Sequence, residues 1–186
     1  MNNLLEDQIR QCFGRVVYTH KTHEKMADLL IDRLGCYKTA QIVLNVITTG
    51  GVVTLFKNDQ EGTKIVTAIV SAISLFVTAY LKSFDMGSLA QKHRDAALKI
   101  LNIRESYLSL LVDIRSNLLV ADAIVKKRDD LQKQLVTVYS SAPSTNFKAY
   151  SMAQKALKEY EEYTFSDSEI DKFLPENLRK STDVIK

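Results

Sequence analysis

Two long uncharged runs in the first half of the chain dominate its pattern of hydrophobic and polar positions. Residues 39–56 carry no charged side chain over 18 positions, and residues 65–81 carry none over 17. As a helix, each run spans roughly 26 Å, close to the roughly 30 Å hydrocarbon core of a bilayer. The eight residues between them, KNDQEGTK, are polar and typical of a turn. The pattern predicts a transmembrane hairpin of two helices over residues 39–82.

A water-soluble bundle with two central helices is the alternative, because both runs are near the short limit for a membrane span. A soluble helix of this length usually carries charge on its outer face, whereas these runs carry none on any face. The membrane interpretation is therefore favoured. Lys and Arg are more frequent on the outer flanks of the two runs than in the turn between them. The positive-inside rule then predicts that both termini are cytoplasmic.

The flanks of the hairpin show heptad spacing, with apolar residues and histidines at alternating steps of four and three. This predicts one long helix over residues 1–38, continuing nearly unbroken into the first run, and a long helical region over residues 83–140. The first seam is Ile9, Phe13, Val16, His20, His23, Ala27, Leu30, Leu34 and Tyr37. The second is Leu89, His93, Ala96, Ile100, Ile103, Tyr107, Leu110 and Ile114. We expect the seams to pack on each other or on neighbouring copies.

Residues 141–186 form a tail with a different texture. Pro143 interrupts the helical pattern, and Ser144 or Thr145 can cap a helix that runs to about Tyr163. Its predicted apolar side contains Phe147, Tyr150, Ala153, Leu157 and Tyr160. Ser166 and Glu169 then have the spacing of a capping box before a short helix that ends near Pro175. With only two prolines in the chain, both in this last quarter, the predicted fold class is all-α.

Polar residues within the hairpin are patterned. Thr67, Ser71, Ser74 and Thr78 recur at steps of four, three and four, which places the hydroxyls on one helical face. One interpretation is close helix packing, with Gly50 and Gly51 as a close approach or a hinge. The other is that the polar face lines a water-filled path when several hairpins assemble. The candidate pore-lining residues are Asn45, Thr48, Thr67, Ser71, Ser74 and Thr78.

All three histidines lie on the heptad seams. A seam histidine is usually a neutral, hydrogen-bonded packing residue. A second hypothesis makes His20, His23 and His93 a pH-sensitive seam. His23 and His93 lie at similar heights above the membrane, so their protonation near pH 6 would loosen the helix pair.

Composition and motifs argue against catalysis. No Gly-rich phosphate loop is present, neither Cys12 nor Cys36 lies beside a histidine, and a metal site at His20 and His23 has little support. We therefore expect a protein that is not an enzyme and has no cofactor or metal. A net charge of +3, with mixed signs along the chain, makes direct nucleic-acid binding unexpected.

The order of parts over about residues 10–140 resembles the SLATT family, the two-transmembrane effectors of bacterial nucleotide-signalling and other conflict systems. The resemblance rests on the segment HKTHEKMADLL, the uncharged hairpin and the stretch LKSFDMGSLAQKHRDAALKILNIRESYLSLLVDI. It implies a multi-pass protein of the bacterial inner membrane, active in anti-phage defence by abortive infection. It also implies a trigger from a separately encoded sensor or nucleotide-generating partner, because no nucleotide-sensing second domain is visible.

The predicted function is an effector that oligomerises in the lipid bilayer and permeabilises the inner membrane when triggered. One hairpin has too few helices to enclose water, so several copies must assemble. Two alternatives remain open. One is a membrane-anchored helical scaffold that recruits a cytosolic partner without forming a pore, and the other is a soluble helical interaction protein.

Overall fold

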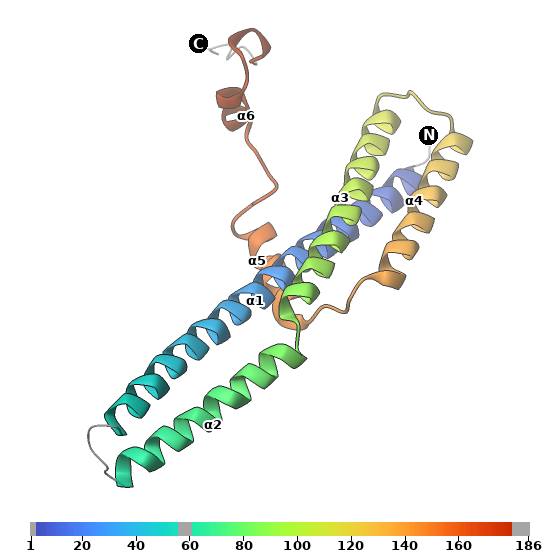
Figure 1. Ribbon diagram of the computed structural model, residues 1–186. Helices are drawn as coiled ribbons and strands as arrows, with labels where there is room; N and C mark the ends of the chain where they lie inside the picture. Colours follow the sequence, from blue (N-terminus) through green and yellow to red (C-terminus); the bar gives the residue numbers. More distant parts are fainter. Residues whose placement is uncertain (1–2, 56–60, 180–186) are drawn as a thin grey trace.

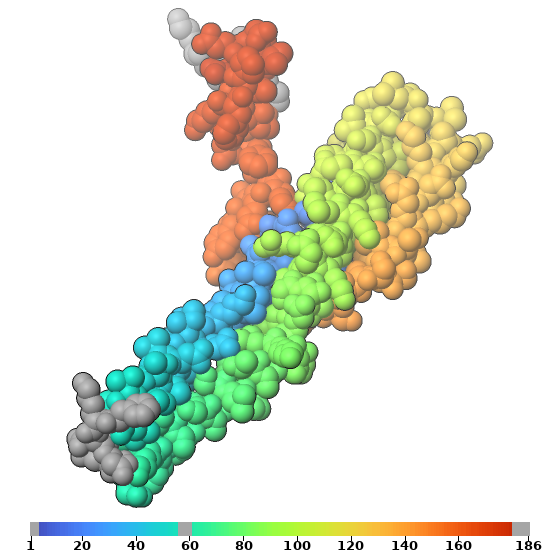
Figure 2. Space-filling model, viewed as in Figure 1, coloured from blue at the N-terminus to red at the C-terminus, as the bar shows by residue number. Residues whose placement is uncertain are grey.

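The computed structural model describes residues 3–55 and 61–179, and all regular structure within these ranges is helical (Figure 1). The predicted all-α fold class is therefore confirmed for the described residues. The helices are α1 (Asn3–Leu55), α2 (Glu61–Ser83), α3 (Met86–Arg115), α4 (Ala121–Ser141), α5 (Phe147–Lys158) and α6 (Asp167–Phe173), followed by a 3-10 turn, η1 (Glu176–Leu178). The molecule is elongated. The C-terminal half of α1 and helix α2 form one end, and α4 and the N-terminus of α1 lie toward the other (Figure 2).

Helix α1 is a single helix of 53 residues that contains both the first heptad seam and the first uncharged run up to Leu55. No proline occurs in it, so no position loses a backbone donor, and the sequence-based expectation of an unbroken helix is met. At about 1.5 Å per residue it is roughly 80 Å long. It is the one element that contacts α2, α3 and α5.

Helix α2 runs back along the lower half of α1, so the two uncharged runs form an antiparallel pair (Figure 1). Of the predicted turn over residues 57–64, residues 57–60 lie outside the described residues, and residues 61–64 instead form the first turn of α2. A short break at Phe84 and Asp85 separates α2 from α3. The Asp85 carboxylate accepts a hydrogen bond from the backbone N–H of Ser88 at 2.8 Å and so caps the start of α3.

The core lies where α3 packs against the N-terminal half of α1, with α4 folded back onto α3. Most of both predicted seams is buried there, including Ile9, Val16, Ile100, Tyr107 and Leu110. The seams fail at their membrane-proximal ends, where Tyr37 is 37% exposed and Leu89 is 36% exposed. At that level α1 changes partner from α3 to α2, so the heptad pairing between α1 and α3 no longer applies.

The tail helix differs from its prediction at both ends. Asn146, rather than Ser144 or Thr145, is the N-cap, and its side chain accepts a hydrogen bond from the backbone N–H of Ala149 at 2.9 Å. The helix ends at Lys158 instead of about Tyr163. Its buried side is made of three alanines, whereas the predicted apolar residues Phe147 and Tyr150 are exposed. Small side chains at steps of four and three let α5 approach α1 closely, which outweighs burial of the larger ones. The buried alanines are Ala149, Ala153 and Ala156.

The short helix α6 begins as predicted. The Ser166 side chain bonds to the backbone N–H of Glu169, and the Glu169 carboxylate bonds back to the Ser166 backbone N–H at 2.8 Å. This reciprocal pair is a capping box, so that prediction is confirmed. Helix α6 extends away from the helical body (Figure 1).

Candidate functional site

The paired helices α1 and α2 present an apolar outer surface. One helical stretch among the described residues is long and apolar enough to cross a membrane. It lies within Glu61–Arg115, has a mean hydropathy of 1.9, and only 11% of it is buried. The first run does not qualify in the same way, because Gln41 and Asn45 lower its hydropathy and Phe56 lies outside the described residues. The prediction of two membrane spans is thus supported by length and composition for one of them. The exposed apolar side chains of the pair include Ile42, Val46, Ile47, Val53, Ile65, Val66, Ile69, Leu75 and Phe76.

Polar side chains meet at the interface between these two helices. The Ser74 hydroxyl donates a hydrogen bond to the Asn45 side-chain oxygen at 2.6 Å. One turn nearer the core, the Gln41 amide donates to the Thr78 hydroxyl at 2.8 Å. Ser74 is 7% exposed, although both helices are otherwise largely open to the surroundings. The two bonds fix the register in which the helices pair. We call these four residues, together with Gly51 and Thr67 described next, the hairpin seam.

Gly51 and Thr67 form the closest approach of the seam. A Cβ atom built on Gly51 would lie 2.5 Å from Thr67 Oγ1, closer than real side chains come. Gly50, by contrast, has open space where a Cβ would be. Only Gly51 is therefore required for close packing, which distinguishes the two predicted hinge glycines. Both lie inside the continuous helix α1, and their role as a hinge stays a prediction.

The six candidate pore-lining residues fall into two groups. Thr67 and Ser74 are buried between the helices, and Asn45 and Thr78 bond across the seam. The others are half-buried: the Ser71 hydroxyl donates to the Thr67 carbonyl oxygen at 2.7 Å, and Thr48 has a buried hydroxyl without a hydrogen-bond partner in the part of the chain described. In a single chain Asn45, Thr67, Ser74 and Thr78 therefore lie at the contact between α1 and α2. Pore lining stays a prediction for an assembled state.

Aromatic residues cluster where the paired ends of α1 and α2 join the rest of the molecule. The rings of Tyr37 and Tyr80 are 5.4 Å apart, and those of Tyr80 and Phe84 are 4.7 Å apart. Lys38 and Lys82 stand beside them in the sequence. Tyrosines and lysines gather at the membrane–water interface, where one end of the side chain is apolar and the other is hydrated. Sequence reasoning missed this cluster because its members come from two runs whose register was unknown.

His23 and His93 form a buried pair between α1 and α3. Their Nδ1 atoms are 2.9 Å apart, so one ring must donate and the other accept. Burial, with smaller effects from His93 and His20, lowers the pKa of His23 to about 4, and burial also lowers the pKa of His93. The sequence placed these two residues at one level correctly. The pKa of His23 therefore lies below the predicted transition near pH 6, and burial shifts the pKa of His93 in the same direction. Loosening of the helix pair by protonation stays a prediction.

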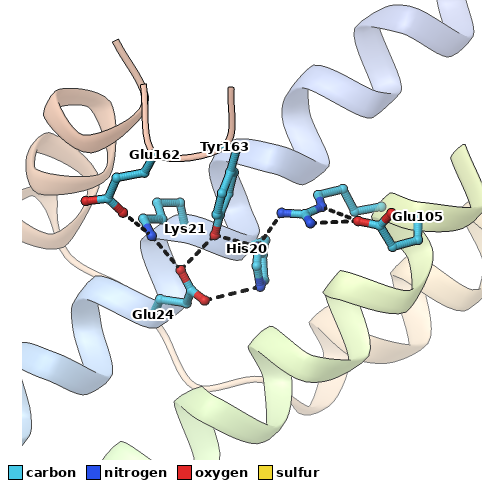
Figure 3. A network of polar contacts seen from close by, with 7 residues as sticks. His20, Lys21, Glu24, Glu105, Glu162 and Tyr163 are labelled. Carbon is cyan, nitrogen blue, oxygen red and sulfur yellow. Dashed lines mark hydrogen bonds and ion pairs between the residues drawn. The ribbon is translucent and has the colours of Figure 1, made fainter. Parts of the chain in front are cut away.

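His20 lies in a different environment, a polar cluster that joins the tail to α1 and α3 (Figure 3). The Tyr163 hydroxyl lies 3.0 Å from His20 Nδ1 and donates to the Glu24 carboxylate at 2.7 Å. The Tyr163 ring stacks on the His20 ring. The Arg104 guanidinium carbon lies 4.5 Å from the centroid of the Tyr163 ring. Lys21, only 7% exposed, bonds to Glu24 at 2.8 Å and to Glu162. We call these six residues the tail clasp.

The protonation states of the tail clasp follow from its contacts. Burial would raise the pKa of Glu24, but hydrogen bonds from Lys21 and Tyr163 outweigh it and the pKa is lowered. Burial opposes the charge of Lys21, yet its bonds to Glu162 and Glu24 raise its pKa. Burial lowers the pKa of His20, so that ring is held toward its neutral form. At neutral pH the one positive charge of Lys21 lies between two carboxylates, and Lys25, with its Nζ 3.3 Å from the Glu162 carboxylate, is a further basic partner.

Apart from His20, sequence reasoning missed the tail clasp. Glu162 and Tyr163 are about 140 positions from Lys21, and no periodic pattern relates residues that far apart. The available signal was composition, since Tyr163 and Glu162 end the run EYEEY just before the α6 capping box. Within the described ranges, no group of three or more His, Cys, Asp or Glu side chains is arranged to hold a metal ion.

Residues 5–169 match the family described as SMODS and SLOG-associating 2TM effector domain family 4, one of the SLATT families. The match covers the helical hairpin, the packed helices on either side of it and the tail clasp, and it ends within α6. No curated protein and no solved structure matches the chain.

Proposed function

The chain belongs to SLATT family 4, the SMODS and SLOG-associating two-transmembrane effectors, and from this premise we propose that it permeabilises the bacterial inner membrane when triggered. The family name supports a membrane effector of a conflict system. The observation that carries the rest is the combination of an exposed apolar surface on α1 and α2 with a polar seam between them. The protein would act by assembly and not by catalysis.

The apolar surface supports insertion of both helices. Large side chains exposed to water along an entire helix pair are unfavourable, whereas a bilayer accommodates them. The aromatic cluster at Tyr37, Tyr80 and Phe84 would then mark the cytoplasmic surface of the membrane. Both termini would lie in the cytoplasm, because α1 enters at that surface and α2 returns to it.

The polar seam supports a channel that opens by rearrangement. In one chain its hydrogen bonds are made between α1 and α2, so the seam is closed. Lining a water path would require these bonds to be exchanged for bonds to water, in an assembly whose copies keep the polar groups away from lipid. The association named for the family supports a separately encoded partner as the trigger of this exchange.

The test is expression in bacteria with membrane potential and dye entry followed over time, with and without the neighbouring genes of the native locus. A variant with Leu at Thr67, Ser71, Ser74 and Thr78 should lose permeabilisation at matched membrane levels. The control carries Leu at Thr49 and Thr54, which are exposed polar residues of the same hairpin. Equal permeabilisation by the seam variant and the wild type would contradict a role for the seam in conduction.

A membrane-anchored scaffold without pore activity makes the opposite prediction. A scaffold would keep its activity when residues 39–82 are exchanged for an unrelated transmembrane hairpin, because only the anchor is needed. A channel would lose its activity. The hydrogen bond that closes the hairpin seam within one chain is the observation that favours a scaffold.

A further inference from the structure

A groove on the body of the molecule has polar and apolar walls and is open to the surroundings in the part of the chain that the structure describes. It lies between α1 and α3 and has a volume of about 400 Å³. Glu24 and Asp28 line it from α1, and Arg94, Leu98 and Leu101 line it from α3. Leu98 is 60% exposed, which is unusual for a leucine beside a packed helix interface.

The apolar wall continues along α3 as a second stripe. Leu98, Leu101, Leu108 and Val112 follow one another at steps of three, seven and four, which keeps them on one helical face. Leu108 is 44% exposed and Val112 is 56% exposed. This face is distinct from the buried seam through Ile100 and Tyr107. Helix α3 therefore has heptad-spaced apolar residues on two faces, and among the described residues one face is buried while the other stays exposed.

Two charged residues of the groove have no partner among the described residues, whereas Glu24 is bonded to Lys21 and Tyr163 in the tail clasp. Neither Asp28 nor Arg94 makes a hydrogen bond or an ion pair with any other described residue, although many of their neighbours do. They stand on opposite walls, one on α1 and the other on α3. The groove thus carries the acidic residues Glu24 and Asp28 on the α1 side, and Arg94 with two leucines on the α3 side.

Such a surface is complementary to itself under a two-fold rotation. Two copies inserted in one bilayer share their orientation, so an axis relating them runs along the membrane normal. Rotation about an axis through the groove brings the α1 wall of one copy opposite the α3 wall of the other at the same height. Each Asp28 then faces the Arg94 of the other copy, and the leucine stripes meet between the two ion pairs.

We propose that a second copy of this chain occupies the groove, forming a two-fold dimer through α1 and α3 outside the membrane. The proposal rests on the proposed function in one respect, that both copies enter the same membrane in the same direction. It adds the surface and the pairing that hold copies together, which neither the family match nor the hairpin specifies. The dimer is a natural unit for building the larger assembly that a water path requires.

Cross-linking in isolated membranes tests the contact directly. All variants carry Cys36→Ser, which removes the exposed native thiol, whereas Cys12 is buried and stays. A short bismaleimide should join two copies of Leu98→Cys into a dimer. The matched control is Val136→Cys on α4, which is 67% exposed but lies outside the groove, and it should give no dimer.

Charge exchange tests the pairing. Arg94→Asp or Asp28→Arg in the Leu98→Cys background should lower the cross-linked fraction about threefold or more, because each change places like charges opposite each other twice in the dimer. The double variant should restore it, which also shows that the single variants fold. Lys99→Asp makes a similar charge change on α3 outside the groove and should leave the fraction unchanged.

Three results would overturn the proposal: equal cross-linking of Leu98→Cys and Val136→Cys, cross-linking of Leu98→Cys to a protein of another mass in place of a dimer, or failure of the double variant to recover. The readout does not depend on permeabilisation. A dimer without membrane damage would leave this inference standing and count against the proposed function. Membrane damage without the dimer would do the reverse.

Discussion

The Ser74 hydroxyl donates a 2.6 Å hydrogen bond to the Asn45 side-chain oxygen, and this bond joins the two uncharged runs of α1 and α2 near their middle. In an apolar environment, a polar group without a partner costs free energy, so the bond favours one register of the pair over its neighbours. The residues predicted from their hydroxyl periodicity are thus positioned by an interaction within the chain.

A double-mutant cycle should measure this bond. Asn45→Ala and Ser74→Ala are each expected to destabilise the helix pair, with a coupling free energy of about 0.5–1.5 kcal/mol, the usual range for such bonds between membrane helices. Thermal unfolding in detergent, followed by circular dichroism, gives the values. The cycle of Thr49→Ala with Ser74→Ala is the control, since Thr49 bonds only to the backbone of its own helix. Additive effects in both cycles would contradict the interpretation.

Gly51→Ala should destabilise the helix pair by about 1–3 kcal/mol. The new Cβ would meet Thr67 Oγ1 at 2.5 Å, and a β-branched residue in a helix has little freedom to turn away. Adding Thr67→Ala should recover most of the loss. Gly50→Ala is the matched control and should be neutral or slightly stabilising, because it has space and improves helix propensity. Similar effects of the two glycine changes on the unfolding temperature would argue against close packing at Gly51.

Lys21→Met should loosen the tail clasp. The change leaves Glu24 and Glu162 without their shared cation, and we expect a loss of about 1–3 kcal/mol, reduced from the value for a fully buried pair because both carboxylates are about one-third exposed. Limited proteolysis after residue 158 should also become faster. Lys133→Met, at a side chain that is 80% exposed, serves as the control and should change neither quantity measurably.

Stability should rise with pH between about 4 and 6.5. The folded-state pKa of His23 is lowered to about 4, so in this window the unfolded chain binds the proton that the folded chain excludes. The lowered pKa values of Glu24 and Glu162 act in the same direction at the acidic end, where their protonation removes stability. His23 alone accounts for at most about 3 kcal/mol, by 1.36 kcal/mol per pKa unit. Stability should be nearly constant from pH 7 to 8.

The variant His23→Gln with His93→Gln checks the source of this dependence. Its unfolding free energy should fall less steeply between pH 6.5 and pH 4 than that of the wild type, because two of the three buried bases are gone. Chemical denaturation at a series of pH values gives the comparison. An unchanged slope would assign the dependence to His20 and the carboxylates of the tail clasp.

Much of the fold could be predicted because it depends on local periodicity. The spacing of Ile9, Val16, Ile100 and Tyr107 identifies the buried faces of α1 and α3 before any contact is known. The Ser166 capping box is equally local. Contacts between distant segments were not accessible in this way, and the insertion of Tyr163 beside His20 has no counterpart in the pattern.

The candidate site shows the same limit. Hydroxyl periodicity placed Thr67 and Ser74 on one face of α2, but the pairing with Gly51 and Asn45 depends on the register between α1 and α2, which no local pattern encodes. The α5 cap was missed for a different reason. Asn146 directly precedes the helix and ranks with serine as an N-cap, so the signal was present but was assigned to its neighbours.

The continuity of α1 has a mechanical consequence. The tail clasp grips this helix at His20, Lys21 and Glu24, and the same unbroken helix carries Asn45 and Gly51 roughly 30–45 Å further along. A continuous helix resists stretching over such a distance, so a sliding or twisting of the N-terminal part of α1 is transmitted along it to the hairpin. A partner that moves the tail therefore needs no intermediate domain, because α1 both binds the tail and forms one side of the proposed channel.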